Sequence, residues 1–186
     1  MEFKELTIKG SFEVTLKPLS DDRGFFMRTF DDKIFETMGL SKKWVQENHS
    51  RSEQKGIIRG LHFQLPPFSE TKMVRCIKGE ILDVFVDIRN GSETFGKWDS
   101  VILSEDNKKM VLIPRGFAHG FCTLSDVSEV VYKVDNYYAP DYEKGILWND
   151  LDIDINWPVL KPILSNKDSI NLSFADFIKH YNGINV

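Results

Sequence analysis

The chain has 186 residues, of which 41% are hydrophobic and 28% are charged. These values are those of an ordinary globular protein that can bury a sizeable core. The formal net charge is −4 at pH 7, and no run of Lys and Arg concentrates positive charge. This balance excludes binding to nucleic acid or to a membrane surface through bulk charge. No apolar run approaches the roughly 18 residues that a membrane-spanning helix needs, and Met1–Gly10 has no signal-like apolar segment.

Two cysteines, Cys76 and Cys122, lie inside apolar segments. A pair of this kind is typical of small buried side chains in a reducing compartment, so we expect a cytoplasmic protein. No repeat, low-complexity tract or linker-like change in composition divides the chain. Residues 1–186 are therefore predicted to form one domain.

The first predicted element is a short helix over Asp31–Met38, with Asp31 placed to cap it and Gly39 to end it. The middle of the chain instead alternates apolar and polar residues with a period of two. In Ile81–Ile88, for example, Val84 and Val86 share one face and Phe85 lies on the other. Further strand-like runs are Lys72–Lys78, Trp98–Ser104, Lys108–Ile113, Phe117–Leu124 and Glu129–Tyr138.

Short turn signals such as Asn90-Gly91 separate these runs, which predicts an antiparallel sandwich, barrel or jelly roll. The last predicted element is a helix over Ser173–Tyr181, because Ser173 can cap it and Phe174 and Phe177 recur at helical spacing. The predicted fold is mainly β with a few short peripheral helices. The pattern leaves the order of the strands open.

Four side chains that can move or attract protons lie in these strands. His62 and Gln64 share a strand face that carries no aliphatic residue. Taken alone, a buried His or Tyr is more often structural, and a Lys at a strand start is more often solvated. Taken together they point to a ligand site, because small barrels collect inward-facing polar residues where a ligand sits. The other three are Lys72, His119 and Tyr132.

A metal-dependent enzyme of this fold class is the obvious alternative. Such a site needs three or four His, Glu or Asp ligands, commonly with His-x-His on one strand. Here His62 is followed by Phe63 and Gln64, so the second imidazole is missing. No GxGxxG or P-loop pattern is present to hold a dinucleotide or triphosphate. We expect neither a metal nor a cofactor.

The sequence resembles the dTDP-4-dehydrorhamnose 3,5-epimerase family from about Val14 to Asp168. The resemblance implies a cupin-type jelly-roll sandwich without a cofactor, and a homodimer in which the N-terminal segment of one subunit completes the site of the other. It is specific because many motifs occur in one order. These motifs are Asp22–Phe26, Gln46–Ser50, Gly56–Gln64, Pro66-Pro67, Asp83–Arg89, Ile113–Phe121, Trp148–Asp150 and Ser165–Asp168.

The resemblance also implies residue roles. His62 matches the base that removes protons beside a ketone, with Asp168 as its carboxylate partner. Lys72 matches the residue that stabilises the enolate oxygen, and Tyr132 the acid on the opposite face of the sugar. Residues implied to bind the nucleotide-sugar substrate are Arg23, Phe26, Arg28, Gln46, Asn48, Arg59, His119, Tyr138 and Lys167.

Elementary chemistry agrees with these roles. Inverting a carbon beside a ketone requires a base on one side of the ring and an acid on the other. Neutral imidazole is available near pH 7, and a carboxylate on its far nitrogen favours the imidazolium that forms. By strict alternation Arg59 points away from His62, so both reach one site only if the chain bends at Gly60 or the strand begins there.

The predicted activity is inversion of C3 and C5 of a dTDP-4-keto-6-deoxyhexose. Arg28 and Glu70 depart from the family pattern, which has Glu and Gln there, and we hypothesise that they pair with each other or face an altered substrate. Three alternatives stay open: an epimerase acting at one position of a related nucleotide sugar, a non-catalytic cupin that binds sugar nucleotides, and a metal-dependent cupin oxygenase or isomerase.

Overall fold

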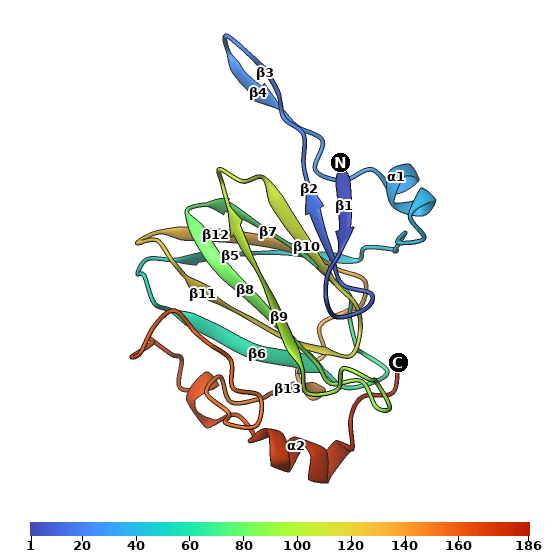
Figure 1. Cartoon of the computed structure of the whole chain (residues 1–186), viewed down its shortest axis with the longest axis vertical. Coiled ribbons are helices and arrows are strands. Elements are labelled where there is room, and N and C mark those ends of the chain that lie inside the picture. Colours follow the sequence, from blue (N-terminus) through green and yellow to red (C-terminus); the bar gives the residue numbers. More distant parts are fainter.

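Short β-strands are the main secondary structure of this computed structural model, which describes all 186 residues (Figure 1). The helices are α1 (Asp32–Thr37) and α2 (Phe174–Tyr181), with a 3-10 turn η1 (Asp168–Ile170). The strands are β1 (Glu2–Glu5), β2 (Phe12–Thr15), β3 (Leu19–Asp21), β4 (Gly24–Phe26), β5 (Gln46–Ser52), β6 (Ile58–Gln64), β7 (Lys72–Lys78), β8 (Glu80–Asp87), β9 (Trp98–Ser104), β10 (Lys109–Ile113), β11 (Phe117–Thr123), β12 (Ser128–Val134) and β13 (Glu143–Gly145).

Two antiparallel sheets face each other as a jelly-roll sandwich. The six-stranded sheet has the order β1-β2-β10-β7-β12-β5, and the five-stranded sheet has the order β13-β6-β11-β8-β9. The hairpin of β3 and β4 belongs to neither sheet and projects away from the sandwich (Figure 1). The predicted fold class, mainly β with short peripheral helices, is confirmed.

The five-stranded sheet is buried on both faces. Phe85 of β8 packs between the sheets, with its ring centroid 6.0 Å from that of Phe117. Val84 and Val86 point to the other face, which α2 and the C-terminal segment cover (Figure 1). Phe177 of α2 is fully buried there. The alternation predicted for β8 is thus confirmed, because both faces of this strand find apolar partners.

A third apolar cluster fixes the N-terminal region to the outer face of the six-stranded sheet. Phe35 of α1 is fully buried, with ring centroids of Phe3 and Phe30 each 5.1 Å away. Both predicted helices form where expected. Ser173 caps α2 by accepting a bond from a backbone N–H, but the Asp31 side chain makes no cap bond.

Several strands differ from the sequence prediction. Strand β12 ends at Val134 rather than Tyr138, because the Asp135 carboxylate turns inward and accepts the Thr71 N–H at 2.6 Å. Tyr138 therefore lies in a loop. The N-terminal strands β1 to β5 and the short strand β13 were not among the predicted runs. None of the helices has the length and apolar composition needed to cross a membrane.

Candidate active site

A cleft between the two sheets gathers most of the predicted site residues. It consists of two cavities of about 270 and 260 Å³ that share His62, Lys72 and Tyr132 in their walls. A larger cavity of about 510 Å³ lies between residues 89–94 and 184–186, but no His or Tyr that could move a proton lines it. The two cavities that share these three side chains are therefore the candidate active site.

A bulge in β6 turns Arg59 and His62 toward the same cleft. Strand β11 pairs His119 with His62 and Phe121 with Arg59, so three steps along β6 match two along β11. Gly60 lies in this bulge with φ +122°, which other residues rarely adopt, and a Cβ there would lie 2.6 Å from the backbone of β11. The chain therefore bends at Gly60. This bend is one of the two arrangements that allow Arg59 and His62 to reach the same site.

His62, which is half-buried, pairs with the buried Asp168. Asp168 Oδ1 lies 2.5 Å from His62 Nε2, and Ser165 Oγ donates to Asp168 Oδ2 at 2.8 Å. Burial alone would raise the pKa of Asp168, but the hydrogen bond from His62 and then that from Ser165 hold this pKa below its usual value. An ionised carboxylate at this place fixes the orientation of the His62 ring.

Tyr132 approaches the cleft from the opposite sheet. It lies on β12 of the six-stranded sheet, whereas His62 lies on β6 of the five-stranded sheet. Val130 and Val134 flank it and are buried, and no group of the chain bonds its hydroxyl. Lys72, also from the six-stranded sheet, is buried and lines both cavities. An imidazole and a phenol thus face one space from two sides.

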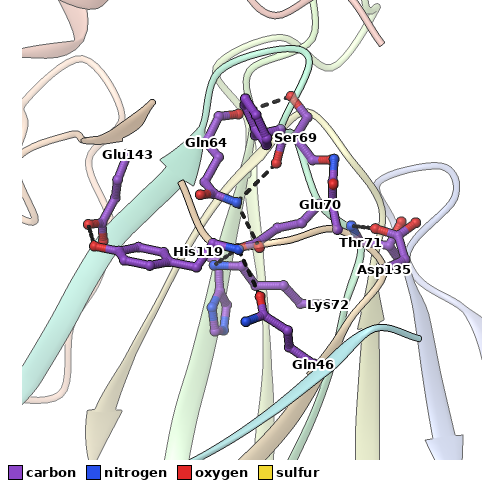
Figure 2. Close-up of polar contacts among 12 residues, drawn as sticks. Gln46, Gln64, Ser69, Glu70, Thr71, Lys72, His119, Asp135 and Glu143 are labelled. Carbon is purple, nitrogen blue, oxygen red and sulfur yellow. Dashed lines mark hydrogen bonds and ion pairs between the residues drawn. The ribbon is translucent and has the colours of Figure 1, made fainter. Parts of the chain in front are cut away.

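Glu143, which the sequence analysis missed, organises the rim of the cleft (Figure 2). Its Oε2 accepts the Tyr138 hydroxyl at 2.7 Å and the Lys167 ammonium at 2.6 Å. Burial would raise the pKa of Glu143, but the bonds from Lys167 and Tyr138 lower it, and Glu143 raises the pKa of Tyr138. In the sequence Glu143 stands beside Lys144 among charged residues, and this pattern did not mark it as a site residue.

The remaining polar walls come from three strands. Gln46 and Asn48 of β5 line one cavity, and Arg59 and His119 the other. His119 Nε2 lies 2.9 Å from a buried carboxylate oxygen of Asp83. The predicted residues that the structure brings together in the cleft are His62, Lys72, Tyr132, Asp168, Gln46, Asn48, Arg59, His119, Tyr138 and Lys167.

Three predicted residues lie away from this cleft. Arg23 and Phe26 are exposed at the projecting hairpin, and Arg28 pairs with Asp31 at 3.0 Å. The hypothesised pairing of Arg28 with Glu70 is therefore wrong within the chain. No group of three or more His, Cys, Asp or Glu side chains is placed to hold a metal ion.

The fold and the cleft define a class of protein, a jelly-roll isomerase with a His–Asp pair on one wall and a Tyr on the other. The family model described as dTDP-4-dehydrorhamnose 3,5-epimerase matches residues 5–176. A curated relative with this name from Shigella flexneri is 53% identical over 161 residues, which cover 86% of this chain and 88% of the relative. The chain belongs to the dTDP-4-dehydrorhamnose 3,5-epimerase family. The protein is an epimerase, and the family and enzyme class predicted from the sequence are confirmed.

Solved structures agree in fold over nearly the whole chain. The epimerase of this name from Bacillus anthracis, with TDP and PPi bound, has a TM-score of 0.91 at 45% identity and covers 92% of this chain and 98% of its own. A dTDP-6-deoxy-D-glucose-3,5-epimerase from Legionella pneumophila, in complex with dTDP-4-keto-L-rhamnose, has a TM-score of 0.92 at 39% identity, with coverages of 100% and 98%.

Proposed function

We propose that the protein inverts C3 and C5 of a dTDP-4-keto-6-deoxyhexose through an enolate. The observation that carries this proposal is the placement of His62 and Tyr132 on opposite sheets around a cleft that Lys72 also lines. The 4-keto group acidifies both neighbouring carbons, so one base can serve two positions. The ligands of the Bacillus and Legionella relatives support a dTDP-sugar as the substrate.

Each step has a side chain suited to it. His62 removes the proton beside the ketone, and the Asp168 carboxylate stabilises the imidazolium that results. The Lys72 ammonium donates to the C4 oxygen as negative charge grows there, an effect worth about 3–4 kcal/mol per donor in related sites. Tyr132 then returns a proton to the opposite face of the ring.

The substrate tail fits the basic side of the cleft. Arg59, His119 and Lys167 line the cavity on this side, where their charge and N–H groups suit a diphosphate. Tyr138 at the rim is exposed and offers a flat face on which the nucleotide base can stack. Gln46 and Asn48 supply polar contacts in the adjoining cavity.

The protein is further proposed to act as a homodimer, in which the β3–β4 hairpin of one subunit brings Arg23, Phe26 and Arg28 to the cleft of the other. The hairpin projects from its own sandwich, and its Leu19 and Phe26 are more than half exposed. Exposed apolar groups on a projecting element are typical of an interface between subunits.

The test is incubation of the dTDP-4-keto-6-deoxyhexose with the protein in deuterated water, followed by NMR. We expect deuterium and inverted configuration at both C3 and C5. Exchange at one carbon alone would support a single-position epimerase. Binding of dTDP without any exchange would support a non-catalytic sugar-nucleotide-binding protein.

A further inference from the structure

A buried carboxylate that the proposed reaction does not use lies beside Lys72. Glu70 Oε1 is 3.3 Å from Lys72 Nζ, and the two side chains are only 12% and 10% exposed. Lys72 makes no other ion pair within the chain. Glu70 lines the cleft together with His62 and Tyr132, so this pair lies at the proposed reaction centre.

Gln64 holds the other oxygen of the Glu70 carboxylate (Figure 2). Gln64 Nε2 donates to Glu70 Oε2 at 3.0 Å, and it also contacts the carbonyl oxygens of Phe68 at 3.0 Å and Tyr137 at 3.2 Å. The amide orientation is set from its other end, because the Ala139 N–H donates to Gln64 Oε1 at 2.6 Å. The amide cannot turn over without losing these contacts, so Glu70 is anchored to β6.

Glu70 thus lies between two donors, the Lys72 ammonium and the Gln64 amide. A carboxylate accepts at both oxygens, whereas an amide in its place accepts at only one. A neutral Gln at position 70 keeps at most one of these two contacts, and it removes the only negative charge that pairs with the largely buried Lys72 ammonium, which is costly. In this chain one carboxylate at position 70 therefore contacts both neighbours at once.

We propose that Glu70 is a positioning residue that holds the Lys72 ammonium where it meets the C4 oxygen of the keto sugar. The ammonium has three hydrogens, and its ion pair with a single Glu70 oxygen leaves donors available for the substrate. This inference rests on the proposed function, because it requires that Lys72 bonds the enolate oxygen. Glu70 acts on the reaction only through Lys72.

The test is a double-mutant cycle with Glu70→Gln and Lys72→Met in the full-length protein. Glu70→Gln is expected to lower kcat by about 10- to 100-fold, the effect of losing the charged partner of a largely buried ammonium. KM is expected to stay within roughly threefold, because the substrate tail binds elsewhere. In the Lys72→Met background, Glu70→Gln should change the rate by less than about twofold, since no ammonium remains to be positioned. Single-turnover deuterium exchange extends the measurement to slow variants.

Glu53→Gln is the matched control, because it removes an exposed carboxylate that pairs with Arg51 outside the cleft, and its kcat should equal that of the wild type. Thermal unfolding and dTDP binding report whether each variant folds. If Glu70→Gln does not fold, Glu70→Asp takes its place in the cycle, with the same non-additivity expected.

Two results would overturn the inference: a wild-type kcat in Glu70→Gln, or losses that multiply in the double variant. A wild-type protein that binds dTDP but epimerises no nucleotide 4-keto sugar would instead overturn the proposed function.

Discussion

His62 and Tyr132 act at different moments of the proposed reaction. His62, paired with Asp168, is needed before the enolate exists, because it removes the proton. Tyr132 lies on the other wall and is needed only when a proton returns to the far face. Loss of each side chain should therefore leave a different isotopic signature.

We predict that His62→Asn abolishes solvent deuterium exchange at both C3 and C5. Tyr132→Phe keeps the ring packed between Val130 and Val134 but removes the hydroxyl. In this variant exchange should persist at one carbon at least, with retained configuration, while inversion there falls by roughly 10²- to 10⁴-fold. NMR of the recovered sugar measures both quantities.

Two outcomes would contradict these roles. If Tyr132→Phe loses exchange and inversion equally, the two side chains do not serve opposite faces. If His62→Asn keeps normal exchange, His62 is not the base and the mechanism is wrong.

At the scale of elements, the β3–β4 hairpin is the part of the chain least attached to the sandwich (Figure 1). It carries Arg23 and Phe26, which do not reach the cleft of their own chain. If the proposed dimer forms, every active site combines a sandwich from one subunit with a hairpin from the other. Inactive variants of the two parts should then complement each other.

We predict that mixing His62→Asn subunits with Arg23→Ala subunits restores activity. A hybrid dimer contains one site with both defects and one site with neither. Random reassociation of equal amounts gives half hybrids, so about one quarter of the wild-type activity should return. Activity is measured after the mixture is unfolded and refolded together, and each variant refolded alone is the control. A mixture no more active than its components would show that the hairpin does not act across subunits.

Strand β5 shows why one element escaped sequence prediction. Its residues are mostly polar, so the strand has no period-two apolar signal. It forms because it pairs along its whole length with β12 at the edge of the six-stranded sheet. This pairing places Asn48 directly opposite Tyr132. A polar edge strand thereby contributes side chains to the lining of the cleft.

The stability of the whole molecule depends on a buried carboxylate outside the cleft. Asp87 at the end of β8 accepts bonds from Arg89, Ser92 and Thr94 at 2.6–2.9 Å. Burial alone would raise its pKa, but the bonds from Arg89, then Ser92 and Thr94, hold it below the usual value. An unfolded Asp titrates near pH 4, so this stabilisation is complete above about pH 4 and is lost as the pH falls through the lowered folded-state pKa.

We predict that Asp87→Asn lowers the free energy of unfolding at pH 7 by about 3 kcal/mol, because Arg89 loses its buried partner. The variant should also lose less stability than the wild type on acidification below about pH 4, since the titrating group is gone. Urea unfolding followed by circular dichroism at a series of pH values measures both effects. Asp106→Asn, in an exposed turn, is the control and should behave as the wild type. If the free energy of unfolding falls equally with decreasing pH in Asp87→Asn and in the wild type, the role of Asp87 is contradicted.

The sequence alone determined the β class, two helices, the strands with clear alternation and the family. These features depend on residue order within short segments, so β7 and β9 begin and end where the pattern predicts. Only the tertiary structure decided which side chains share the cleft. Asp168 lies 106 residues from His62, and Glu143 joins nearby Tyr138 to Lys167 in a distant segment. Local periodicity carries no information about such distances, because they are set by strand pairing, by the bulge at Gly60 and by the packing of loops between the sheets.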